Sequence, residues 1–111
     1  MTLKTSIIED KPNGILITHN ADWSGIVRIA WYMVDGQRSA LQECWCVGRD
    51  LIAGRFTPVS APNKPEHGRG SLTATPINIL TRAVTLAVET YLRSRLQAFV
   101  DTLYTIDRGK L

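Results

Sequence analysis

The sequence predicts an α+β fold, in which a four-stranded antiparallel β-meander over residues 3–48 precedes a long loop and a C-terminal helical segment. Three observations lead to this prediction. Short apolar runs separated by turn residues fill the first part of the chain, prolines and glycines interrupt residues 49–75, and helical periodicity covers residues 76–106. A chain of 111 residues has room for one hydrophobic core, so we expect a single domain over residues 1–111.

Turn signals divide the meander into strands. A Pro-Asn-Gly sequence, typical of a tight turn, separates strands at residues 3–9 and 14–19. An Asp-Gly pair marks a second tight turn between two longer strands, at residues 25–34 and 38–47. Residues 56–60 can add one more short strand, which the proline in that segment restricts to an edge of the sheet.

The Asp-Gly turn also predicts how the two long strands pair. A two-residue turn at this position sets three opposite pairs: Arg28 with Glu43, Trp31 with Ala40, and Val27 with Cys44. An opposite-charge pair on one face is the outcome expected of a correct register.

The helical segment begins at Thr75-Pro76, a capping residue followed by proline at the first helical position. Its apolar residues form two faces, rotated by a right angle or somewhat more: Ile77, Leu80, Val84, Ala87 and Tyr91, then Leu92, Leu96, Phe99, Leu103 and Ile106. An unbroken helix of this length measures about 46 Å, whereas a compact domain of this size is about 26 Å across. We therefore expect a helix that is kinked or split near Arg93, or one that projects from the domain.

The second helix face predicts self-association. One four-stranded sheet cannot cover both faces, so the surplus face needs a partner. We expect a homodimer or a higher oligomer, whose interface contains Leu92, Leu96, Phe99 and Leu103.

Composition limits the class of protein and its location. The net charge of +3 and a pI near 9.1 permit an anionic partner without requiring one. The two cysteines are separated by one residue, which excludes a disulfide framework. No uninterrupted apolar stretch reaches 18 residues, so we expect no membrane association. A reducing cytoplasm is the expected location, the host cytoplasm if the protein comes from a phage.

The Cys44-Trp45-Cys46 sequence is the first candidate for chemistry. Alternation along a strand places both thiols on one face, and His19 ends a neighbouring strand. A metal site needs further ligands, and free cysteines usually pack as small apolar residues, so we expect neither metal nor cofactor. No motif of nucleophilic, zinc-dependent or nucleotide-dependent catalysis is present, and we expect a protein that is not an enzyme.

The tryptophans suggest a second kind of surface. Trp31 and Trp45 lie on adjacent strands and on opposite faces in the predicted pairing, so one of them belongs to the core. The other, with Tyr32 or Arg28 nearby, can form a stacking platform for nucleic-acid bases on the open sheet face. The alternative is an open face that a second subunit covers, and this alternative is favoured for a chain so apolar.

The basic, Pro/Gly-rich loop over residues 49–75 is the main candidate for function, since long loops in compact domains are often binding loops. Two glycines beside Arg69 favour an anion-binding nest, and the start of the helix adds partial positive charge. The predicted ligand-binding residues are Arg49, Arg55, Lys64, His67, Arg69 and Ser71.

Two functions follow from these observations. The first is non-enzymatic binding of a phosphate-bearing ligand, either a nucleotide or a single-stranded nucleic acid, through residues 49–76. The β-β-β-β-α order is similar to that of the transcription-coactivator and plant whirly single-strand binders, although fold does not carry function. The alternative is a phage or mobile-element protein that acts as an inhibitor or adaptor by binding another protein. Compact proteins without catalytic motifs resemble host-defence inhibitors of this kind.

Overall fold

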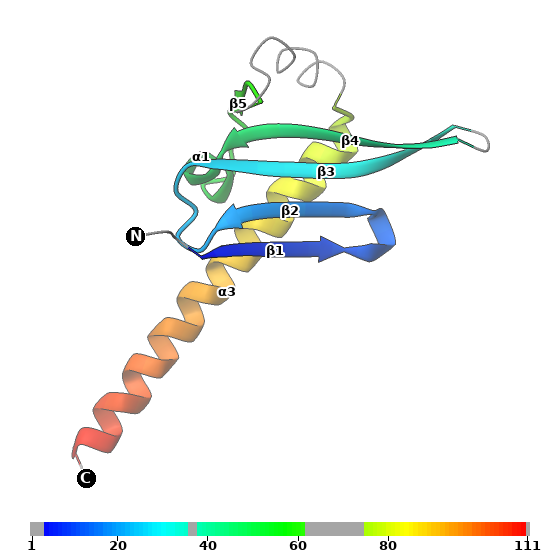
Figure 1. Ribbon diagram of the computed structural model, residues 1–111. Helices are drawn as coiled ribbons and strands as arrows, with labels where there is room; N and C mark the ends of the chain where they lie inside the picture. The colour runs from blue at the N-terminus through cyan, green and yellow to red at the C-terminus, as the bar shows by residue number, and fades with distance from the viewer. Residues whose placement is uncertain (1–3, 36–37, 62–74, 111) are drawn as a thin grey trace.

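The computed structural model describes residues 4–35, 38–61 and 75–110. They form one antiparallel sheet, with strands in the order β1-β2-β3-β4-β5, and a long helix, α3, that crosses one face of the sheet (Figure 1). The elements in chain order are β1 Thr5–Asp10, a 3-10 turn η1 Lys11–Asn13, β2 Ile15–Asn20, β3 Ile26–Asp35, β4 Arg38–Val47, α1 Gly48–Ile52, β5 Pro58–Val59 and α3 Ile77–Lys110. The α+β prediction is confirmed.

The sheet has five strands, so the predicted count of four is wrong. The added strand is β5, within the segment where the sequence allowed a short edge strand. It pairs with β4 through Trp45 opposite Val59, and Val47 N donates a hydrogen bond to Thr57 O at 2.9 Å. Pro58 fits there because a proline, which has no N–H to donate, is tolerated on an edge strand.

The predicted register of the two long strands is wrong by two residues. Arg28 lies opposite Trp45 rather than Glu43, and Glu43 lies opposite Ala30. A shift of two residues keeps every side chain on its face, so the hydrophobic pattern cannot detect it. Arg28 still forms an ion pair with Glu43, now along a diagonal of the sheet. The strands are connected at positions 36–37, which lie outside the described residues.

The core lies between the sheet and the first half of α3. Alternate residues of β2, β3 and β4 point toward the helix and are buried, while Ala83 and Ala87 of α3 are fully buried against them. Leu51 of α1 and Trp23 close one end of this layer. Trp31 is buried in the same core and Trp45 lies on the opposite face, as the alternation of strand residues predicted.

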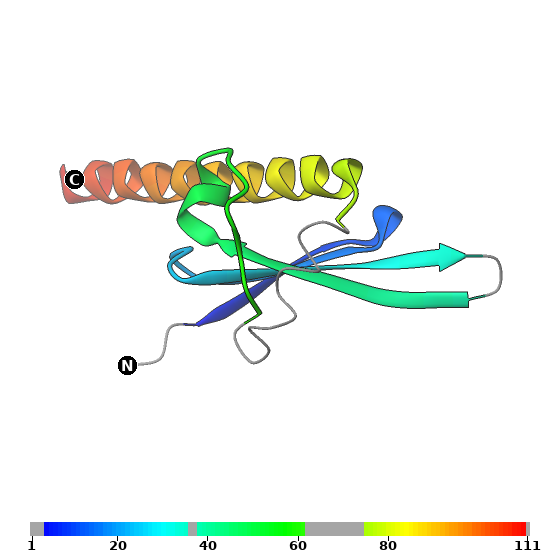
Figure 2. The same ribbon diagram turned by 90° about the horizontal axis from the view of Figure 1, so that it is seen from above.

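Helix α3 is one continuous helix, so the predicted kink or split near Arg93 is wrong. Figures 1 and 2 show it running straight past the edge of the sheet, and the molecule extends over 62 × 30 × 23 Å. Sharp bends need a proline, a glycine or an inserted group. The Arg93-Ser94-Arg95 sequence contains neither proline nor glycine, so the helix projects instead. Within the described ranges, no helix is long and apolar enough to cross a membrane.

Candidate interaction surfaces

The predicted phosphate site is only partly described. Lys64, His67, Arg69 and Ser71 lie outside the described residues. Arg49 is exposed on α1, and Arg55 lies in the turn after α1, where its Nη2 is 3.3 Å from Asp50 Oδ1. Asp50 Oδ2 also accepts a hydrogen bond from Thr57 Oγ1 at 2.7 Å. Asp50 therefore neutralises part of the charge of Arg55.

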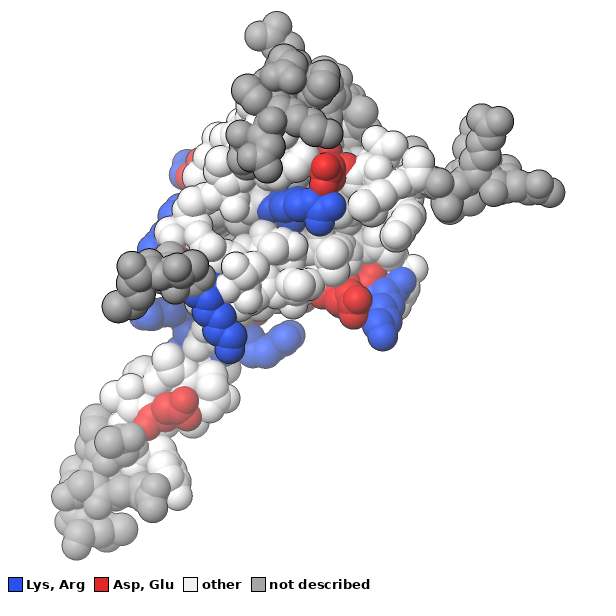
Figure 3. Space-filling model, viewed as in Figure 1, with Lys and Arg blue, Asp and Glu red and all other residues white. Residues whose placement is uncertain are grey.

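Other basic residues lie where α3 leaves the body of the protein, a term used here for the sheet together with the first half of α3. Figure 3 shows lysine and arginine side chains gathering at this end of the molecule. Arg93 and Arg95 are exposed on α3 just beyond Tyr91, which packs against the core. Neither of these two arginines was among the predicted ligand-binding residues.

The projecting half of α3 carries a row of exposed apolar side chains, here called the α3 stripe: Leu92, Leu96, Phe99 and Leu103. Their exposed fractions are 57%, 63%, 60% and 47%. Val100 and Tyr104 flank the stripe and are also exposed. Burying a large apolar side chain is worth about 1.5–3 kcal/mol, so a contiguous exposed row of this kind is a candidate interaction surface. All four predicted interface residues thus lie on one exposed surface.

The open face of the sheet, turned away from α3, is a second exposed surface. Figure 3 shows it as mostly uncharged, with one basic side chain beside an acidic one near its middle. Tyr32 and Leu41 are exposed opposite one another on β3 and β4, and Ile7 is exposed on β1. Arg28 and Glu43 form their ion pair on this face.

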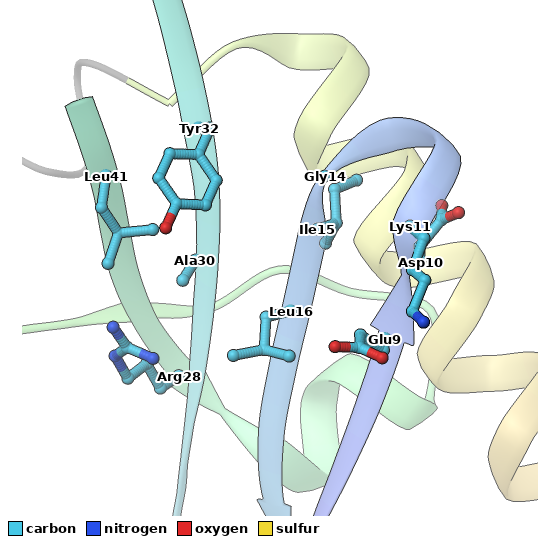
Figure 4. A pocket seen from close by; sticks show the side chains of 10 residues that line it. All are labelled: Glu9, Asp10, Lys11, Gly14, Ile15, Leu16, Arg28, Ala30, Tyr32 and Leu41. Atoms are coloured by element: carbon cyan, nitrogen blue, oxygen red, sulfur yellow. The ribbon is translucent and has the colours of Figure 1, made fainter. Parts of the chain in front are cut away.

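A hollow of about 350 Å³ opens on this face between the ends of the two hairpins. Its floor is Ala30, a small residue, and Figure 4 shows Tyr32 and Leu41 on one side with Leu16 on the other. Glu9, Lys11 and Arg28 supply charges of both signs around it. The charges around the hollow are therefore of both signs, unlike the uniformly positive surfaces that bind nucleic-acid phosphates.

A partly buried ion pair connects the first hairpin to α3. Arg82 Nε donates a hydrogen bond to Asp10 Oδ2 at 2.9 Å, and Asn13 Nδ2 donates to the same oxygen at 2.9 Å. Asp10 is nearly buried. The hydrogen bond from Arg82, helped by that from Asn13, lowers the pKa of Asp10. The carboxylate is therefore a structural anchor between segments distant in sequence.

The cysteines and His19 are placed for packing rather than for chemistry. Cys44 and Cys46 are fully buried, and burial raises their pKa values to about 11 and about 12, so both remain thiols. His19 is stacked on Trp23 with ring centroids 3.6 Å apart. Across residues 4–35, 38–61 and 75–110, no three histidine, cysteine or acidic side chains form a group that could hold a metal ion.

The sequence interpretation missed the open-face hollow and the basic residues at the base of the projecting helix. The hollow depends on Ala30 lying between Leu16 and Leu41 across three strands, which requires the register to be known. The two arginines could have been recognised from the sequence, because Arg93 directly follows Leu92 and Arg95 directly precedes Leu96 of the second apolar face.

The chain matches no protein-family model, no curated protein and no solved structure.

Proposed function

We propose that this protein is a non-enzymatic interaction protein of the adaptor or inhibitor class, and that it self-associates through the α3 stripe. The observation that carries the proposal is the stripe itself, on a helix that extends beyond the body it packs against. A soluble monomer gains nothing from a continuous apolar row exposed to water. A partner surface that covers the row removes that cost.

The spacing of the stripe favours a helix as its partner. The intervals between its residues are four, three and four, which is the repeat of a left-handed coiled-coil seam. A second copy of the chain offers the same seam, and a two-fold pair of identical surfaces is the commonest oligomer. The open sheet face, with Tyr32 and Leu41, then stays available for a different protein.

The test is the mass of the particle in solution, measured by light scattering after size-exclusion chromatography. We expect the wild-type protein to be dimeric or larger, with a mass that rises with concentration because the seam is short. Leu96→Asp and Phe99→Asp should each shift the protein to the monomer, since a carboxylate would be buried in the seam. Both should keep the circular dichroism spectrum, because these side chains are exposed within one protomer.

Two matched controls separate the stripe from general apolar exposure. Ser94→Asp introduces the same charge on the same helix, rotated about 170° from the centre of the stripe. Leu41→Asp removes an exposed leucine from the open sheet face. Both should retain the wild-type mass. A wild-type monomer at every concentration, or a Leu96→Asp protein of wild-type mass, would rule out the proposal.

The second candidate function is binding of a phosphate-bearing ligand, as the basic loop predicted. It is supported by the exposure of Arg49 on α1, and of Arg93 and Arg95 at the base of the projecting helix. We expect ATP to raise the melting temperature, or single-stranded DNA to bind with an affinity that falls steeply with salt. Arg69→Ala should reduce either effect more than Arg55→Ala, because Asp50 neutralises part of the charge of Arg55. No response to either ligand would remove this candidate.

A further inference from the structure

We infer that two copies of α3 pair in antiparallel order over residues 92–103, so that the two bodies lie at opposite ends of the helix pair. This inference rests on the proposed self-association and adds the orientation of the partner. The seam alone does not decide the orientation. Antiparallel pairing sets Leu92 against the partner's Leu103 and Leu96 against the partner's Phe99, and parallel pairing sets each residue against its own copy. Every layer is apolar in both orders.

The charges beside the stripe decide between the two orders. Arg93 and Arg95 are separated by about 160° around the helix, with the stripe between them. They therefore occupy the two positions that flank the seam at the level of Leu92 and Leu96, where interhelical charge contacts select partners. Both guanidinium groups are exposed within one protomer.

Parallel pairing would gather four guanidinium groups around one level of the seam. Like charges at such distances destabilise a helix pair. Antiparallel pairing places Arg93 and Arg95 beside positions 100 and 102 of the partner helix, where the sequence has valine and threonine, so no like charges meet. The helix dipoles also oppose one another in this order, which is the favourable arrangement.

The position of the body favours the same order. Only the first half of α3 packs on the sheet, so the body lies at one end of the helix (Figures 1 and 2). Parallel pairing would bring two bodies to the same end, together with the basic residues at the base of each helix. Antiparallel pairing separates these bodies, each of which belongs to a chain of net charge +3.

Disulfide trapping with single introduced cysteines tests the orientation. The native thiols do not interfere, because Cys44 and Cys46 are fully buried and remain protonated. In the antiparallel pair, Leu92 is separated from the partner's Leu92 by about 16 Å along the axis, whereas a disulfide spans at most about 7 Å between Cα atoms. We expect Leu92→Cys alone and Leu103→Cys alone to give no covalent dimer on mild oxidation. An equimolar mixture, with one variant carrying a mass tag, should give the mixed covalent dimer.

The outcomes separate this inference from the proposed function. Efficient cross-linking of Leu92→Cys with itself, in a protein that light scattering shows to be dimeric, would establish parallel order and overturn the inference alone. A dimer in which neither single variant nor the mixture cross-links would also overturn it. A wild-type monomer would overturn self-association itself. Ser94→Cys, which faces away from the seam, is the control and should not cross-link with itself or with either variant.

Discussion

His19 shows how burial sets the chemistry of a single residue. Its ring is 6% exposed, lies parallel to the Trp23 indole within 7°, and donates a hydrogen bond from Nδ1 to Asn20 O at 2.7 Å. Burial lowers the pKa of His19 below its usual value of 6.5, and the hydrogen bond opposes this shift only in part. The folded state therefore holds the neutral imidazole more strongly than the unfolded chain does.

This shift predicts a pH dependence of stability. The unfolded chain binds more protons than the folded protein between the two pKa values of His19, so stability falls as pH falls. The contribution is fully present above pH 6.5, the usual value, and is lost as the pH drops through the lower folded value. We expect the free energy of unfolding in urea to decrease between about pH 7 and pH 5. His19→Phe keeps an aromatic ring on Trp23 and should show a smaller decrease; an equal slope in both proteins would contradict the assignment to His19.

At the scale of the element, α3 serves two purposes in its two halves. The first half lies close to the sheet because its contact positions include two alanines, Ala83 and Ala87, both fully buried. The Asp10–Arg82 pair joins the same half to the first hairpin. The second half has no sheet beneath it and exposes large apolar residues instead. The change of face near Arg93 marks the edge of the body, not a bend in the helix.

Because α3 lies close to the sheet at Ala87, a larger residue at this position should lower the stability of the protein. Ala87→Leu must displace the helix or its neighbours, and overpacking of this kind costs about 1–3 kcal/mol. Ala98→Leu makes the same change at an exposed position of the same helix, with little difference in helix propensity. We expect a lower midpoint of urea unfolding for Ala87→Leu and a midpoint near the wild-type value for Ala98→Leu. Equal midpoints would show that the helix is not held close at Ala87.

At the scale of the whole molecule, the shape follows from the length of α3. A helix that continues past the sheet makes an elongated protomer, 62 Å in its longest dimension, with a body at one end and an apolar stripe on the projection. Self-association involves the whole molecule, because none of the other described elements of the protomer covers the stripe. The open sheet face is the other large surface of the described residues, and charges of both signs surround its apolar hollow.

The sequence by itself determined the α+β class, the approximate positions of the strands and the two faces of the helix, because side-chain alternation and helical periodicity are local properties. It also placed Trp31 and Trp45 on opposite faces of the sheet, since a register shift of two residues leaves every side chain on its own face. Only the tertiary structure decided the register that pairs Arg28 with Trp45, the fifth strand, and the continuity of α3. These depend on contacts between distant segments. The helix is the clearest case: the sequence has no proline or glycine near Arg93 to bend it, but only the extent of the sheet decides which half of α3 projects.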